Sequence, residues 1–156
     1  MKHLKNILLI LCLLFSACGE DDDSNIVAGY PNFKINLAIT DAELRGANTF
    51  KEYVKGKHPV LEGESLGYAG LVVVNTIYAT NVPDLVAFDL SCPHEKSPVI
   101  RVKTSFKDGN MIARCEECGR EYDLMKKGSE VTNQKLRLQP YVVHKTSDAD
   151  IFRVSR

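Results

Sequence analysis

The chain has 156 residues, with 20 Lys and Arg against 20 Asp and Glu, so that its formal net charge is zero. This length is that of one domain with its own hydrophobic core, and the balanced charge excludes nucleic-acid binding through a basic surface. A hydrophobic content of 44% and a charged content of 26% exclude a wholly disordered chain and a multi-pass membrane protein. Composition therefore predicts one soluble domain.

The first segment has the pattern of an export signal. Lys2 and Lys5 precede an apolar run from Ile7 to Phe15, which is followed by the small residues Ser16 and Ala17. This run is too short for a helix that crosses a bilayer, which needs about 20 residues. A basic start, a short apolar stretch and a small-residue end are typical of a cleaved secretory signal. Residues 1–17 are therefore predicted to be absent from the mature protein.

The end of this signal resembles the lipobox of bacterial lipoproteins, with Phe15 in place of the usual Leu. The resemblance implies that Cys18 carries lipid, becomes the mature N-terminus and anchors the protein to a membrane. A plain signal peptide with a chance Cys is the alternative. Residues 18–31 begin with an acidic run, which predicts a solvated tether. That run also resembles the acidic signal of surface-exposed lipoproteins in Bacteroidetes-type bacteria, so we expect the protein at the outer membrane or cell surface.

Residues 32–156 have the pattern of an antiparallel β-domain. Apolar residues alternate with polar ones from Phe33 to Ile39, and Asp108-Gly109 between two short runs is typical of a hairpin turn. Residues 41–57 predict a loop with at most one or two helical turns, because residues 40–43 resemble a capping box while glycines interrupt any longer helix. The expected strands are 33–39, 71–74, 85–90, 100–106, 111–113, 141–143 and 151–154. The sequence therefore predicts an all-β sandwich or barrel.

Four residues of metal-ligating type stand at the ends of these expected strands. Cys92-Pro93-His94 follows the strand 85–90, and Cys115-Glu116-Glu117-Cys118-Gly119 follows the return strand of the hairpin. Two residues between Cys115 and Cys118 let both sulfurs face inward, and Gly119 permits the positive φ of a metal knuckle. Three thiols and an imidazole on two loops therefore predict a metal site.

The pattern of these two loops resembles the Rieske family, which binds a [2Fe–2S] cluster through Cys-x-His on one loop and Cys-x-x-His-Gly on the other. The resemblance continues through Tyr122-Asp123-Leu124, and it covers roughly residues 68–154. It implies a Rieske-like antiparallel β-sandwich with a small metal-binding subdomain formed by two loops, at about residues 91–123. The family pattern differs here because Cys118 takes the place of the second His.

This resemblance implies that Cys92 and Cys115 hold an inner iron and that His94 and Cys118 hold an outer one. An additional thiolate is expected to lower the reduction potential relative to centres with two His ligands, because it adds negative charge. The chain would then be a one-electron carrier with a redox protein as its partner and no catalytic site of its own.

Other occupants of the same four residues stay open. Three Cys and one His are also a complete set of ligands for tetrahedral zinc. A disulfide without metal is a third state, because exported thiols meet an oxidising compartment. The signal segment has no Arg pair, whereas chains exported with a preformed cluster usually carry a twin-Arg signal. A non-enzymatic surface binding module with zinc or a disulfide is therefore the alternative function.

Other candidate chemistry is weaker. A thioredoxin-like dithiol would lie at a helix N-terminus among cationic groups, whereas Glu116 and Glu117 are expected to raise the pKa of the neighbouring thiols. His58 precedes a proline in a loop-like stretch, and His144 ends a strand, so both are expected at the surface or at an edge. We can argue neither a Ser/His/Asp triad, nor a phosphate-binding loop, nor a pair of catalytic carboxylates from this sequence.

Overall fold

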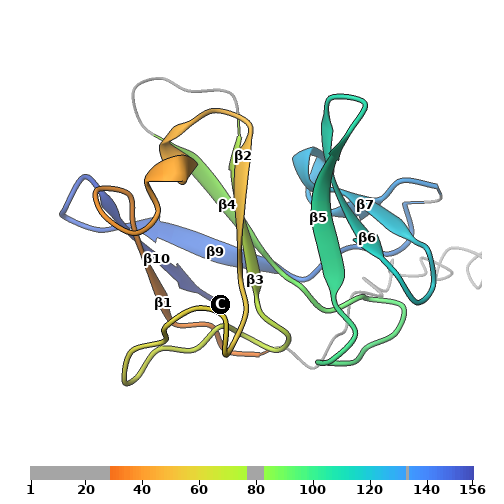
Figure 1. The fold of residues 1–156 in the computed structure, drawn as a ribbon, viewed down its shortest axis with the longest axis horizontal. Helices are drawn as coiled ribbons and strands as arrows, with labels where there is room; N and C mark the ends of the chain where they lie inside the picture. The colour runs from red at the N-terminus through yellow and green to blue at the C-terminus, as the bar shows by residue number, and fades with distance from the viewer. Residues whose placement is uncertain (1–28, 77–82, 133) are drawn as a thin grey trace, which may run out of the picture.

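The computed structural model describes residues 29–76, 83–132 and 134–156, which form two antiparallel sheets side by side (Figure 1). The larger sheet has the strand order β1-β10-β9-β4-β3-β2, and the smaller has the order β5-β6-β7-β8. The predicted signal segment, Cys18 and most of the predicted tether lie outside the described residues. The strands of the larger sheet are β1 (Phe33–Asn36), β2 (Thr49–Tyr53), β3 (Leu71–Thr76), β4 (Asp84–Asp89), β9 (Pro140–Lys145) and β10 (Ile151–Ser155). The smaller sheet contains β5 (Val102–Lys107), β6 (Asn110–Cys115), β7 (Glu121–Asp123) and β8 (Ser129–Glu130).

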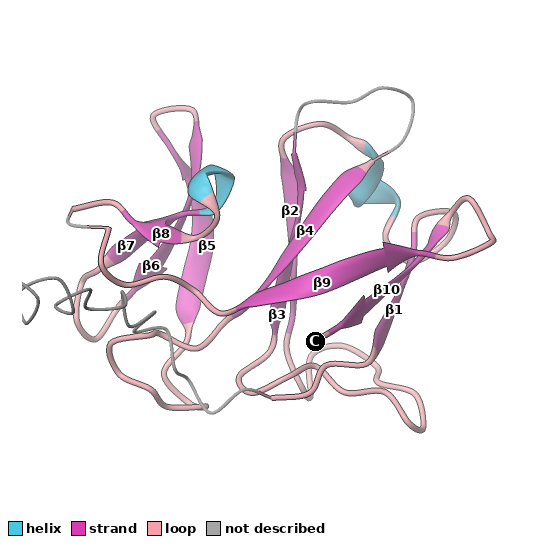
Figure 2. Ribbon diagram, turned by 180° about the vertical axis from the view of Figure 1, so that it is seen from behind, coloured by secondary structure: helices cyan, strands magenta, loops and turns pink. Residues whose placement is uncertain are grey.

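The larger sheet curls because β9 changes its partner along its length. Pro140 and Tyr141 pair with β4, whereas Val142 to Lys145 pair with β10. Figure 2 shows β9 running across the molecule at a steep angle to β2, β3 and β4. One strand therefore joins two halves of the sheet and turns the fold into a curved structure.

β3 lies at the centre of the molecule, and both of its faces are buried. Leu71 and Val73 contact the core inside the curl of the larger sheet, while Val72 and Val74 contact the core between the two sheets. All four are 0% exposed. A strand covered on both faces carries a continuous apolar run rather than an alternating one, which explains the sequence of this segment.

The smaller sheet is an excursion of the chain between β4 and β9 (Figure 1). β5 and β6 form a hairpin whose turn residues Asp108 and Gly109 have φ values of 50° and 80°. Two consecutive positive φ values are those of a type I′ turn, whose twist matches that of the flanking strands. This excursion carries the loops that were predicted to hold a metal.

A shared apolar core attaches the smaller sheet to the larger one, and three contacts at its edge add to it. Phe50 of β2 packs on Phe106 of β5 with ring centroids 5.3 Å apart. The backbone N–H of Thr104 donates to Glu52 Oε1 at 2.7 Å, and Arg101 Nε donates to the carbonyl oxygen of Ala69 at 2.7 Å. These apolar and polar contacts fix the smaller sheet against the larger one.

The predicted all-β antiparallel class is confirmed, as is a small subdomain that presents two loops. The strand predicted over 33–39 is shorter, because the chain turns after Asn36, whose carbonyl oxygen accepts from Thr40 and Asp41. The loop predicted over 41–57 is wrong in part. It contains the short 3₁₀ helix η1 (Ala42–Arg45) but also the strand β2, because five residues pair in register with β3.

The capping box predicted at residues 40–43 is wrong as well. Asp41 precedes η1, but its side chain makes no capping hydrogen bond. Its carboxylate instead accepts from Asn36 N at 2.7 Å and from the hydroxyl groups of Thr40 and Tyr53 at 2.8 and 2.9 Å. Partners outside the helix therefore replace the local cap. A second 3₁₀ helix, η2 (Leu124–Lys126), follows β7.

Within the three described ranges, neither 3₁₀ helix nor any other helix has the length and apolar character needed to cross a membrane.

Candidate metal centre

The first candidate loop begins at a fixed point, the buried carboxylate of Asp89 at the end of β4. This carboxylate accepts hydrogen bonds from Ser91 N at 2.7 Å, from Tyr68 N at 2.8 Å and from the Tyr141 hydroxyl at 2.8 Å. Burial raises the pKa of Asp89, although these hydrogen bonds favour its charged form. The chain that enters the loop at Cys92 is therefore held to both the larger sheet and its neighbouring loop.

The first loop turns tightly immediately after Cys92. The carbonyl oxygen of Cys92 accepts from Lys96 N at 2.9 Å, and Lys96 has a φ of 51°. The amide of Cys92 donates to the carbonyl oxygen of Ile100 at 3.3 Å, which closes the base of the loop. His94 and Glu95 lie inside this turn.

The second loop repeats the geometry of the first. The carbonyl oxygen of Cys115 accepts from Gly119 N at 3.0 Å, and Gly119 has a φ of 70°. A Cβ atom on Gly119 would meet no other atom within 4 Å, so the backbone angle rather than space requires glycine here. The positive φ predicted for Gly119 from the knuckle pattern is therefore confirmed.

The two loops bring the predicted residues together. Sγ atoms of Cys92, Cys115 and Cys118 all lie within 4.8 Å of one another, and those of Cys92 and Cys118 are 3.7 Å apart. Ligand atoms of His94, Glu95 and Cys118 form a second group within the same distance. Cys118 belongs to both groups, so it links the buried thiols to the exposed imidazole.

The solvent exposure of the four candidate ligands increases from the core side of the site to its surface side. Cys92 and Cys115 are 0% exposed, Cys118 is partly buried, and the side chain of His94 is 46% exposed. His94 is therefore the most exposed of the four residues. Its Nδ1 atom lies 2.9 Å from Glu95 Oε1. The site thus has a dry side in the core and a side that faces solvent.

In the metal-free protein, the pKa of the Cys118 thiol is raised to about 12. Burial is the main cause, and hydrogen bonds with the thiols of Cys115 and Cys92 add to it, while a hydrogen bond from Arg120 N opposes it. A raised pKa was expected for this thiol, but its main causes are burial and the neighbouring thiols rather than Glu116 and Glu117. Both are exposed, and Glu116 pairs with Lys103 at 2.7 Å.

Tyr122 on β7 supports the site from the core. Its hydroxyl oxygen lies 3.5 Å from Cys92 Sγ, and its side chain is fully buried. Burial raises the pKa of Tyr122, so this hydroxyl keeps its proton at neutral pH. It can therefore donate to a Cys92 thiolate.

The residue types suit two kinds of metal centre, but the spacing of the sulfurs agrees with only one of them. With Zn–S bonds of about 2.3 Å, two thiolates on one tetrahedral ion lie about 3.8 Å apart. The Cys92–Cys118 separation of 3.7 Å agrees with that arrangement. A [2Fe–2S] cluster with Cys92 and Cys118 on different irons needs these two sulfurs farther apart, because both irons lie between them. Three thiols and an imidazole are suitable ligands for either group.

Some residues of the site were not predicted as part of it. Glu95 lies close to the ligand atoms of His94 and Cys118. Its place directly after His94 in the sequence could have indicated that it belongs to the site. The ion pair between Arg120 and Glu130 had no such signal, because the two residues come together only through the pairing of β7 with β8. His58 accepts a hydrogen bond from Val54 N, and His144 is exposed beside Ser155, so neither belongs to the groups of ligand atoms.

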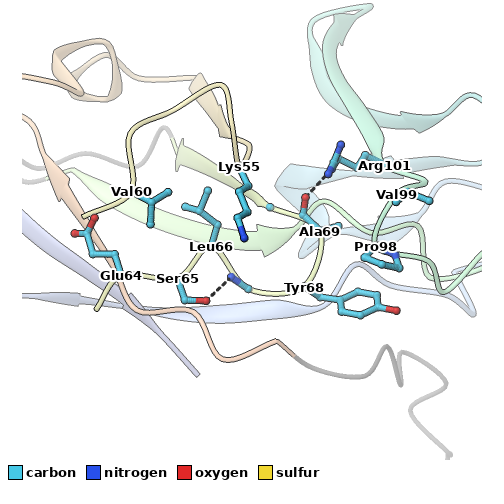
Figure 3. Close-up of a pocket in the computed structure, with 12 residues that line it drawn as sticks. Lys55, Val60, Glu64, Ser65, Leu66, Tyr68, Ala69, Pro98, Val99 and Arg101 are labelled. Carbon is cyan, nitrogen blue, oxygen red and sulfur yellow. Dashed lines mark hydrogen bonds between the residues drawn. The ribbon is translucent and has the colours of Figure 1, made fainter. Parts of the chain in front are cut away.

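A pocket of about 400 Å³ adjoins the first loop (Figure 3). Pro98, Val99 and Arg101 line one side of it, and residues 64–70 line the other. Figure 3 shows Lys55 extending toward the chain near Tyr68, while Arg101 binds the carbonyl oxygen of Ala69. Its lining contains none of the four candidate ligands, so this pocket is separate from the candidate metal centre.

No family model matches the chain, and no curated protein matches it. A solved structure with a similar arrangement is described as "putative NADH-dependent nitrite reductase small subunit from Mycobacterium tuberculosis". The TM-score is 0.43 and the sequence identity is 9%, over 83% of this chain and 96% of that one. This similarity is too low to assign a family or an activity.

Proposed function

We propose that this protein is a Rieske-like one-electron carrier that holds a [2Fe–2S] cluster at the tips of the smaller sheet. Cys92 and Cys115 would bind the inner iron, and His94 and Cys118 would bind the outer one. The cluster would supply one-electron oxidation and reduction when bound. The chain itself would supply the ligands, exclude water from the inner side and present the outer side to a partner.

The gradient of exposure carries this proposal. Two ligands are fully buried, one is partly buried, and the imidazole is exposed. An electron carrier needs this arrangement, because its centre must be protected from solvent and yet lie near the surface for transfer to a partner. The Tyr122 hydroxyl supports the same role, because hydrogen bonds to ligand sulfurs tune the potential of a cluster. Glu95 beside His94 and the exposed Glu117 next to Cys118 favour a basic redox protein as the partner.

A structural zinc site in a non-enzymatic binding module is the second candidate. The 3.7 Å between Cys92 Sγ and Cys118 Sγ favours it, because this separation suits two thiolates on one ion. The same closeness suits a Cys92–Cys118 disulfide in the metal-free protein. In both cases the function would be binding rather than electron transfer.

We also propose that the protein acts outside the cytoplasm, at the outer membrane or cell surface, through a lipid on Cys18. The basic start, the short apolar run and Ser16-Ala17-Cys18 support this location. An electron carrier there would exchange electrons with a protein of the cell envelope.

Analysis of iron, zinc and acid-labile sulfide in anaerobically purified protein tests the proposal. A cluster gives two irons and two sulfides per chain, with visible absorption that bleaches on reduction. One zinc per chain without visible absorption would favour the binding module and contradict the electron carrier. The same measurement on a Cys115→Ala variant shows whether the metal found is held at this site.

A further inference from the structure

An ion pair between Arg120 and Glu130 lies directly after the second loop, and none of the candidate ligands takes part in it. Glu130, on β8, is only 2% exposed, and its Oε1 atom accepts from the guanidinium of Arg120. Its other oxygen, Oε2, is buried and has no hydrogen-bond partner among the described residues. A buried carboxylate is costly without a partner, so the position of Glu130 depends on Arg120.

Arg120 holds the second loop through its main chain. Its carbonyl oxygen accepts from Cys115 N at 2.9 Å, and its N–H donates to the Cys118 thiol. Both Cys residues of the loop therefore have a backbone hydrogen bond to the same residue. Because Glu130 fixes the side chain of Arg120, the buried carboxylate also restrains the backbone that positions the two sulfurs.

Arg120 also brings a positive charge to the site. Arg120 stands two residues after Cys118, so its cationic side chain belongs to the same short segment as the two thiols of the loop. Metal binding requires thiolates, so three Cys ligands gather negative charge at this point. A nearby cation stabilises that charge, and residues behind the ligands of a metal site typically change its affinity by 10–100-fold.

We infer that Arg120 and Glu130 are positioning residues of the metal centre, which hold the Cys115–Cys118 loop in its binding geometry and offset the charge of its thiolates. This inference rests on the proposed function, because it concerns the affinity of the same site. The role extends beyond the four ligands and assigns a purpose to a carboxylate that lies buried in the smaller sheet.

Titration of reduced, metal-free protein with Co²⁺ tests the inference, because thiolate ligation of this ion gives a charge-transfer band and a dissociation constant together. Glu130→Gln should weaken Co²⁺ binding by about 10–100-fold and alter the band. Glu121→Gln is the matched control, because Glu121 lies in the same sheet and its carboxylate pairs with Lys107 Nζ at 2.8 Å rather than with Arg120. This control should bind Co²⁺ as the wild type does.

Amide hydrogen exchange in the metal-free protein gives a readout that needs no metal. Glu130→Gln should speed exchange at the N–H of Cys115, which donates to the carbonyl oxygen of Arg120, and at the N–H of Arg120, which donates to the Cys118 thiol. The Glu121→Gln control should leave both exchange rates unchanged. Wild-type exchange together with wild-type Co²⁺ affinity in Glu130→Gln would overturn the inference. If the wild type binds no Co²⁺, the proposed function fails, while the exchange rates still decide the positioning role.

A double variant separates charge from folding. Arg120→Gln/Glu130→Gln leaves no unpaired charge at either of these two positions, so it should fold even where Glu130→Gln alone does not. We expect its Co²⁺ affinity to stay at least tenfold below that of the wild type, because the cation beside Cys118 is gone. Recovery of wild-type affinity in this variant would show that the charge of Arg120 has no role.

Discussion

Cys118 is the residue that distinguishes this site from one with two cysteines and two histidines. Its sulfur belongs to both groups of ligand atoms, and its pKa is raised to about 12, chiefly by burial. At neutral pH this thiol is protonated in the metal-free protein, so metal binding must release its proton. Metal affinity at this site should therefore rise with pH.

Replacement of each candidate ligand by Ala should abolish or greatly weaken metal binding, because each loss leaves an incomplete site. The four variants are Cys92→Ala, His94→Ala, Cys115→Ala and Cys118→Ala. Metal content per chain after purification measures the effect. His144→Ala is the control, since this imidazole is exposed on β9 beside Ser155. Full metal content in Cys118→Ala would show that Cys118 is not a ligand.

Tyr122→Phe should keep the metal and change its properties. The lost hydroxyl lies 3.5 Å from Cys92 Sγ, so the substitution removes one hydrogen bond and leaves the ring in the core. We expect the free energy of unfolding to fall by about 1 kcal/mol and the reduction potential of a bound cluster to fall as well. Chemical denaturation and a redox titration measure the two effects. An unchanged potential would show that this hydroxyl does not act on the site.

The candidate ligands were predictable from residue types and spacing, because Cys-x-His and Cys-x-x-Cys-Gly are local patterns. Their support was not predictable. Arg120 meets Glu130 through the register of β7 and β8, and the hydroxyl of Tyr122 on β7 contacts Cys92 inside the core. Contacts of this kind depend on which strands become neighbours, and no short sequence pattern records that choice.

At the scale of the secondary structure, strands with a clear period were predicted well. β1 alternates buried and exposed residues, and β3 is a short continuous run of apolar residues. β2 was missed because its residues have no alternating pattern, and most of its side chains are only partly buried. The strand exists because it pairs with β3 at the edge of the sheet, where tertiary pairing outweighs local sequence preference.

Asp41 connects η1 to this edge strand and should give the protein an acid-sensitive contribution to stability. Burial raises its pKa, but hydrogen bonds from Asn36 and from Lys51 and two hydroxyl groups outweigh this, so the pKa is lowered overall. A lowered pKa means that the contribution is complete above the ordinary carboxyl pKa of about 4 and is lost as the pH falls through the folded value.

Asp41→Asn should therefore lower the free energy of unfolding at pH 7 by about 1–3 kcal/mol. It should also reduce the loss of this free energy between about pH 5 and pH 2, the range in which carboxyl groups titrate. Denaturation curves across this range measure both effects. Asp150→Asn serves as the control, because Asp150 forms an exposed ion pair with Arg45, a kind of pair that contributes little. Equal acid slopes in the wild type and Asp41→Asn would contradict this account.

At the scale of the whole molecule, the smaller sheet projects from the larger one and carries the candidate site at its loops (Figure 1). Contacts between Phe50 and Phe106 and between Glu52 and Thr104 hold the two sheets together. The larger sheet would then act as a rigid base, while the loops of the smaller sheet form the surface that meets a partner.

The predicted lipid anchor concerns the whole protein and its place in the cell. Cys18→Ala should move the protein from the membrane fraction to the soluble fraction and remove the mass of the lipid from the mature chain. Cys12→Ala is the control, since Cys12 lies inside the predicted signal and is removed with it. Membrane fractionation and mass spectrometry of both variants measure the effect. Retention of Cys18→Ala in the membrane fraction would contradict a lipid anchor at this residue.

The most direct test of the electron-carrier proposal is a potentiometric titration of anaerobically purified or reconstituted protein, followed by its absorption and electron paramagnetic resonance spectra. The proposal predicts a reversible one-electron couple, with a potential below that of centres with two His ligands because Cys118 adds thiolate charge. Cys118→His should raise this potential and strengthen its dependence on pH, because a second ligating imidazole joins that of His94 and can lose a proton, whereas the thiolate it replaces cannot. A chain that binds one zinc ion, or no metal, and shows no reversible couple would contradict the proposal.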